Sequence, residues 1–211
     1  NSFNIVGGFL NLTISDKYYL NFIESIKDDI DFGKSKKQNE TFIVEFSSPN
    51  TNKPLHLGHI RNNLLGYSIS KILEANGKNV KKVQIINDRG IHICKSMIAW
   101  KQYGEGKTPK SENIKGDKFV GDYYILFDKI HNEQKNELLK SGIEKDKAED
   151  STQIMQDAKN ELMNWENNDE ETLKIWNMMN QWVYEGFEST YKLLGVSFDK
   201  NYYESQTYLL G

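Results

Sequence analysis

The residues of this chain with the clearest chemical potential lie in one short stretch, SPNTNKPLHLGHIR at positions 48–61. Two of the four histidines flank a glycine there, as His56-Leu57-Gly58-His59. On the first turn of a helix, side chains three residues apart face the same way. Two such imidazoles can donate hydrogen bonds to phosphate oxygens as negative charge grows during displacement at phosphorus. The spacing therefore indicates phosphoryl or nucleotidyl transfer by positioning. The alternative is a helix start with two exposed histidines.

The residues around this stretch predict the elements that must position it. TFIVEF at 41–46 predicts a buried strand, and a helix is expected over 55–76, ended by Gly77. A second strand at 79–87 follows, and DRGIHICKSMIAW at 88–100 begins a second helix. Strand–helix–strand–helix with short joints predicts an α/β fold with a parallel, Rossmann-like sheet. Such sheets bind ligands where strands end and helices begin, and a helix N-terminus suits phosphate. Gly58 would leave room for a flat ring against the backbone.

The rest of the chain divides by texture. Residues 5–14 predict a short strand pair or a strand after a Gly-Gly turn, and residues 16–30 predict a helix. Residues 33–40 predict a polar linker or the boundary of a small N-terminal piece. Helices are expected over 119–140, 151–166 and 169–194, after which a strand-like pattern resumes. The Trp and Met residues at 176–182 are expected to pack in a core. We therefore predict four parts. Residues 1–38 form an N-terminal tail and linker, and residues 39–103 form the start of the catalytic sheet. Residues 104–175 form a mostly helical insertion, and residues 176–211 return to the sheet.

Composition narrows the function classes. The net charge of −3 over 211 residues gives no general attraction to nucleic acid. The single cysteine, Cys94, fits a reducing cytosol, and no apolar run approaches the length of a membrane span. A zinc site would have only His92 and Cys94 as further ligands, so no bound metal is expected. His92 and His131 are expected on helix surfaces. The sequence lacks both the G-x-x-x-x-G-K-[ST] loop and the G-x-G-x-x-G turn, so those nucleotide-binding motifs are excluded.

The H-x-G-H motif in this setting resembles the nucleotide-binding signature of class I aminoacyl-tRNA synthetases. VEFSSPNTNKPLHLGHIRNN at 44–63 is similar, nearly residue for residue, to the same region of arginyl-tRNA synthetases. NDRGIH at 87–92 and YYES at 202–205 resemble two further motifs of that family. GGFLNLTIS at 7–15 resembles the end of the additional domain that precedes the catalytic domain there. The resemblance is weak only across about 104–175.

The resemblance implies activation of L-arginine by ATP with Mg²⁺ and transfer of arginine to tRNA(Arg). His56 and His59 would contact the ATP phosphates, and Gly58 would lie against the adenosine. The resemblance further implies that arginine is bound by residues near His59, namely Glu45, Ser48, Asn50, Asp88 and Glu204. A carboxylate such as Glu204 suits a guanidinium, which takes paired, charge-assisted hydrogen bonds. The alternatives for Glu45 and Asp88 are a polar strand end and a helix cap. The implied protein is a monomer in the cytoplasm without a membrane partner.

The family's lysine-bearing loop and its anticodon-binding domain have no counterpart in these 211 residues. We therefore expect a truncated piece of the enzyme that does not charge tRNA by itself. Two alternatives stay open at this point. One is a free-standing nucleotidyltransferase with the same H-x-G-H site, and the other is a non-catalytic, synthetase-like binding module.

Overall fold

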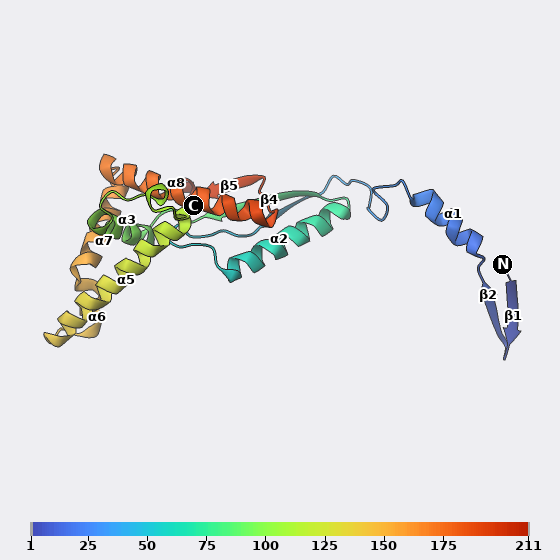
Figure 1. Cartoon of the computed structure of the whole chain (residues 1–211), viewed down its shortest axis with the longest axis horizontal. Helices are drawn as coiled ribbons and strands as arrows, with labels where there is room; N and C mark the ends of the chain where they lie inside the picture. The colour runs from blue at the N-terminus through green and yellow to red at the C-terminus, as the bar shows by residue number, and fades with distance from the viewer. Residues whose placement is uncertain (1, 211) are drawn as a thin grey trace.

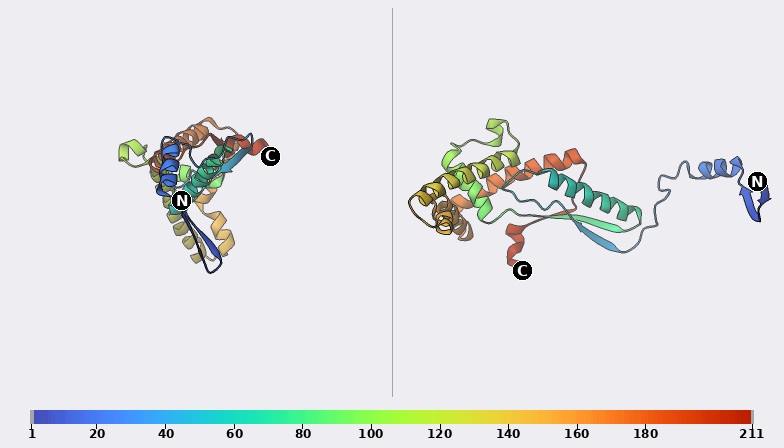
Figure 2. Two further views of the ribbon diagram at one scale, coloured as in Figure 1. Left: turned by 90° about the vertical axis from the view of Figure 1, so that its right-hand side faces the viewer. Right: turned by 90° about the horizontal axis from the view of Figure 1, so that it is seen from below.

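A computed structural model describes residues 2–210 of the chain. At the N-terminal end, β1 (Ser2–Val6) and β2 (Phe9–Thr13) form an antiparallel hairpin, which confirms the predicted strand pair. Its turn uses Gly7 and Gly8, both with positive φ. Helix α1 (Asp16–Ile26) follows, and none of its residues is buried. These three elements lie apart from the rest of the chain, at the end of an extended linker (Figures 1 and 2).

The central sheet is parallel, in the order β3 (Thr41–Glu45), β4 (Asn79–Ile86), β5 (Lys200–Tyr203). Helix α2 (Leu57–Ala75) connects β3 to β4, so the predicted strand–helix–strand unit is confirmed. Gly77 ends α2 with φ +79°, and an added Cβ there would lie 2.1 Å from the carbonyl oxygen of Lys36. Glycine is therefore required at this joint both by conformation and by space.

The prediction that residues 41–46 form a buried strand is wrong in one respect. Phe46 is buried, but Ile43 is 73% exposed, and β3 lies at the edge of the sheet. Both α2 and α8 (Glu170–Leu194) lie on the face that carries Phe46 and Gln84: the ring of Phe46 meets Gly66 of α2, and Tyr191 of α8 bonds Gln84. The opposite face carries Ile43 and Ile85, and both of these side chains are exposed. The apolar composition of β3 therefore predicts that a strand forms, but the burial of that strand depends on the tertiary structure.

A helical layer packs beside the sheet. It contains α3 (Ile91–Tyr103), α5 (Gly116–Lys140), α7 (Gln153–Glu166) and α8, with short helices α4 (Pro109–Glu112) and α6 (Lys145–Ser151) in the connections. One cluster, with Met97, Phe119 and Val183, joins α3, α5 and α8. A second, with Phe127 and Ile154, joins α3, α5 and α7. The predicted insertion thus shares its core with α3, and α8 runs unbroken through the predicted boundary at 175 (Figure 1).

The chain returns to the sheet through β5 and then forms α9 (Glu204–Thr207) and the 3₁₀ turn η1 (Tyr208–Leu210). Met179 is buried, as the helical spacing of residues 176–182 predicts, and Trp176 and Trp182 pack against the same cluster. Among the residues that the structure describes, none of the helices has both the length and the apolar content that crossing a membrane requires.

Candidate functional site

The loop after β3 is joined to the end of β4 by main-chain hydrogen bonds. Asn87 N donates to the carbonyl of Pro49 at 3.0 Å, and Thr51 N donates to the carbonyl of Asn87 at 3.0 Å. Asn50 and Asn87 thereby form an isolated parallel bridge beyond the regular sheet. Two segments with distant positions in the sequence are held side by side in this way. The loop that carries Ser48 and Asn50 is therefore held against the residue that follows the central strand β4.

The two histidines of the H-x-G-H motif form the N-terminal cap of α2. The Nδ1 atom of His56 accepts from Gly58 N at 3.1 Å, and Nδ1 of His59 accepts from His56 N at 3.2 Å. Their ring centroids lie 4.1 Å apart. In each neutral ring, an Nδ1 that accepts leaves the proton on Nε2. The pair therefore presents Nε2–H donors while its Nδ1 atoms secure the helix start.

The electrostatics at this helix start favour an anion. The first turn of α2 contains no acidic residue, so its positive dipole end is uncompensated. Partial burial lowers the pKa of His59 below its ordinary value of 6.5, with smaller contributions from the nearby His56 and Lys53. A neutral His59 keeps the Nδ1 acceptor that the cap requires. The arrangement can therefore donate to phosphate oxygens without losing its own structure.

Gly58 lies close to the ring of His56. A Cβ added at this position would lie 2.9 Å from Cε1 of the His56 ring and 3.1 Å from its Nδ1. A side chain here would displace the imidazole that caps the helix. From the sequence, Gly58 is expected to make room for a ring of the ligand, and the structure adds this internal reason.

Glu45 and Ser48 lie together at the end of β3. Ser48 Oγ donates to Oε1 of Glu45 at 2.8 Å and accepts from Ile85 N at 3.1 Å. Glu45 is exposed, and Ser48 is half-buried. Ser47 and Ser48 both have positive φ, 68° and 45°, a conformation that residues other than glycine rarely adopt. Strained backbone of this kind concentrates at functional sites.

Asn50 and Glu204 line one cavity of about 260 Å³, although they lie in distant parts of the sequence. Asn52, Asn87 and Arg89 line it as well. The guanidinium of Arg89 lies over the ring of Tyr208, 3.7 Å from its centroid, and pairs with Glu166 at 3.3 Å. These three further lining residues were not singled out from the sequence. Their position in the NDRGIH motif at 87–92 was the only available signal for Asn87 and Arg89.

Asp88 is buried, and both oxygens of its carboxylate accept hydrogen bonds from other residues of the chain. Oδ1 accepts from Ser205 N at 2.8 Å, and Oδ2 accepts from Ser205 Oγ at 2.7 Å and from Tyr184 OH at 3.0 Å. Its main-chain carbonyl accepts from Trp176 Nε1 at 2.6 Å. The N-cap of α3 is Gly90, so Asp88 does not cap that helix. Its carboxylate instead joins β4 to α8 and to the start of α9, next to Glu204.

Three further residues that the sequence singled out are His92, Cys94 and His131. His131 is buried and its Nε2 lies 2.8 Å from the carbonyl of Glu149, so the prediction of a surface position is wrong for His131. His92 is exposed, as predicted. Burial raises the pKa of the Cys94 thiol to about 12, which keeps it protonated. Within residues 2–210 no three His, Cys, Asp or Glu side chains are grouped as metal ligands.

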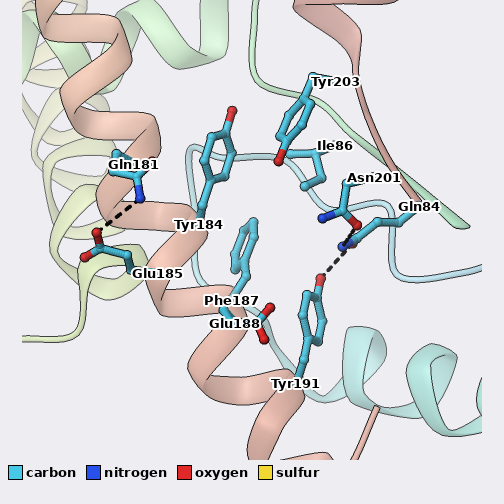
Figure 3. Close-up of a pocket in the computed structure, with 10 residues that line it drawn as sticks. All are labelled: Gln84, Ile86, Gln181, Tyr184, Glu185, Phe187, Glu188, Tyr191, Asn201 and Tyr203. Atoms are coloured by element: carbon cyan, nitrogen blue, oxygen red, sulfur yellow. Dashed lines mark hydrogen bonds between the residues drawn. The ribbon is translucent and has the colours of Figure 1, made fainter. Parts of the chain in front are cut away.

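A second cavity, of about 450 Å³, lies between α8 and the covered face of the sheet (Figure 3). Tyr184 and Tyr191 of α8 line it together with Gln84 of β4 and Asn201 of β5. The hydroxyl of Tyr191 donates to Gln84 Oε1 at 2.9 Å, and Gln84 Nε2 donates to Asn201 Oδ1 at 3.0 Å. Polar groups of the wall thus bond one another across the helix–sheet interface.

Comparisons with known proteins show what the chain as a whole is similar to. The model of the family described as tRNA synthetases class I (R), catalytic domain, matches residues 23–208. The chain is 52% identical over its whole length to the arginine–tRNA ligase of Flavobacterium psychrophilum, and 53% identical over 98% of its length to that of Porphyromonas gingivalis. It covers 35% of each relative, about a third of their length. A solved arginyl-tRNA synthetase from Thermus thermophilus shares the fold, with a TM-score of 0.60 at 24% identity, over 97% of this chain and 29% of that one.

Proposed function

The chain belongs to the family of class I tRNA synthetases for arginine, and from this premise we propose that it forms one side of an active site that activates L-arginine with Mg-ATP and transfers it to tRNA(Arg). The observation that carries the proposal is the paired His56–His59 cap, which leaves two Nε2–H donors at a helix start without acidic residues. This is the arrangement that a transferring phosphate group requires.

In the proposed first step, a carboxylate oxygen of arginine attacks the α-phosphorus of ATP. The new bond joins that oxygen to the phosphorus, and the bond to the leaving pyrophosphate breaks. Negative charge on the phosphate oxygens increases on the way. His56 and His59 donate to those oxygens, and the N-terminus of α2 adds its dipole. Magnesium enters with ATP as part of the substrate and further shields the phosphate charge.

In the proposed second step, a terminal ribose hydroxyl of tRNA attacks the carbonyl carbon of arginyl-adenylate. The ester to tRNA forms, the bond from the carbonyl carbon to the phosphate oxygen breaks, and AMP leaves, its phosphate taking up the proton that the hydroxyl loses. Positioning of the two reacting groups is proposed to carry this transfer. The working enzyme is proposed to be a monomer of the cytoplasm, the compartment that fits the single reduced cysteine.

Selection of arginine is assigned to the cavity that Asn50 and Glu204 line. Glu204 is half-buried at the start of α9 and lines the cavity that Asn50 also lines. A carboxylate there would form paired, charge-assisted hydrogen bonds with the planar guanidinium. Ser48 and Asn50 would hold the main-chain end of arginine, with Glu45 oriented by Ser48. A lysine side chain cannot reproduce the planar pairing, and it would leave polar groups unpaired.

The test is ATP–pyrophosphate exchange by the complete gene product, with each amino acid in turn and with or without tRNA. Among the amino acids, only arginine should support exchange, and His59→Asn should lower the rate of that exchange. Lys71→Ala is the matched control: it lies near the other end of α2, and its exposed pair with Glu74 contributes little stability. Exchange with several amino acids would favour a free-standing nucleotidyltransferase, and no exchange would favour a binding module.

A further inference from the structure

Two tyrosines of α8 contact the two loops that the proposed arginine site depends on. Tyr184 and Tyr191 are seven residues apart, so they lie on the same face of the helix, two turns from each other. Both side chains line the pocket of Figure 3, where Tyr191 points to Gln84 of β4. The helix itself is anchored in the core by the buried residues Met179, Val183 and Phe187. Helix α8 therefore presents two hydroxyls from a rigid base.

The first hydroxyl acts on the segment that carries Glu204. Tyr184 OH donates to Asp88 Oδ2, and the same carboxylate takes both the main-chain N–H and the Oγ–H of Ser205. Ser205 directly follows Glu204 at the start of α9. Burial and the charge of Asp88 raise the pKa of Tyr184, so its proton stays available for the donation. The direction of Glu204 thus depends on a carboxylate that Tyr184 helps to hold.

The second hydroxyl acts on the loop that carries Ser48 and Asn50. Tyr191 OH lies 2.7 Å from Ser47 Oγ and donates its single proton to Gln84 Oε1. Ser47 must then be the donor to Tyr191. Ser47 and Ser48 are two consecutive residues with positive φ, so this bond secures an unfavourable backbone conformation. Ser48 directly follows Ser47, and its hydroxyl lies beside Glu45 and accepts from Ile85 N, so the Ser47 bond helps to position it.

We infer that α8 positions both halves of the arginine site through the hydroxyls of Tyr184 and Tyr191, neither of which lies among the residues assigned to bind substrate. The inference rests on the proposed function. It makes the two tyrosines positioning residues for arginine recognition, whereas the cap formed by His56 and His59 holds itself together without them. Loss of either hydroxyl should therefore affect arginine and spare ATP.

The experiment compares Tyr184→Phe and Tyr191→Phe in the complete gene product, by steady-state ATP–pyrophosphate exchange. Each change removes one oxygen and keeps the ring. The KM for arginine should rise about 10-fold in each variant, since a buried hydrogen bond is lost, while the KM for ATP stays unchanged. The double variant should show the product of the two effects, about 100-fold, because the two hydroxyls act through separate partners.

Tyr103→Phe is the matched control. Tyr103 is 46% exposed at the end of α3, and its hydroxyl makes no hydrogen bond with other described residues. It should leave both KM values unchanged. Ser205→Ala supplies a second route to the same result: combined with Tyr184→Phe it should be less than multiplicative, because both act on Asp88 Oδ2.

An active wild type whose two Phe variants keep the KM for arginine would overturn this inference alone. The inference also fails if the KM values for ATP and arginine rise together, since that pattern reports general loss of structure. A wild-type protein without arginine-dependent exchange would overturn the proposed function, and this inference with it.

Discussion

The H-x-G-H cap and the Asp88 network hold their polar groups in opposite ways. The cap is solvent-facing, and its two hydrogen bonds span two and three residues of sequence. The Asp88 network is buried, and the donors to its carboxylate lie 96 and 117 positions away. A local motif can tolerate changes elsewhere in the fold, whereas a long-range network fails when any of its elements moves. The two substrates proposed for this site are therefore held by structures of different robustness.

The largest expected effect is chemical and belongs to the cap. His59→Ala removes a donor to the reacting phosphate, and we expect the rate of arginine-dependent exchange to fall about 100- to 1,000-fold. The free energy of unfolding should change little, because the contacts of His59 are local and partly exposed. Pre-steady-state formation of adenylate and urea unfolding measure the two quantities. Lys71→Ala should leave both as in wild type, and a large loss of stability in His59→Ala would break the comparison.

The next effect belongs to recognition of arginine. Glu204→Gln keeps the shape of the side chain and removes its charge, so the KM for arginine should rise about 10- to 100-fold. The KM for ATP should stay constant, since the cap is untouched. Exchange kinetics at varied arginine and ATP provide both values. Glu185→Gln, an exposed glutamate of α8, is the control, and equal KM values in wild type and Glu204→Gln would remove Glu204 from the site.

A third prediction concerns stability. Asp88→Asn places an amide NH₂ or a weaker acceptor against the donors of Ser205 and Tyr184, and we expect the free energy of unfolding to fall by about 2 kcal/mol. Urea unfolding at neutral pH measures it. Glu45→Gln changes an exposed carboxylate that accepts a hydrogen bond from the nearby Ser48 hydroxyl, and it should cost much less. Equal losses would erase the contrast between the network and the surface.

The smallest effect is the pH dependence of the cap. Burial lowers the pKa of His59 in the folded chain below 6.5, so the unfolded chain binds the proton more readily. Stability from this residue is complete above pH 6.5 and decreases as the pH falls from 6.5 toward the lower folded pKa. His59→Asn should flatten the slope of unfolding free energy between about pH 5 and 7, measured by urea unfolding across that range. His92, whose pKa burial also lowers, contributes a slope of the same sign that remains in the variant.

The sequence predicted those features whose cause lies within a few residues. Gly77 ends α2 as its place after the last helical residue predicts, and α8 ends at Leu194, the predicted end of that helix. Gly77 and Gly195, which follow the two helices, both have positive φ. The parallel order of β3 and β4 follows from a strand–helix–strand pattern with short joints. The exposure of β3, the burial of His131 and the shared core of α3 with α5, α7 and α8 were not predictable, because each depends on which distant element packs there.

The same division holds at the site. The pairing of His56 with His59 is determined by the sequence itself, because a helix start places residues three apart on one side. The contact that crowds Gly58 against the His56 ring is known only from the structure. Only the tertiary structure shows that Asp88 accepts hydrogen bonds from Ser205 and Tyr184 and that Tyr191 bonds Ser47. It also places Asn50 and Glu204 on one cavity. Those hydrogen bonds join residues 96 to 144 positions apart. Their register is set by the packing of α8 on the sheet, which no local pattern of residues contains.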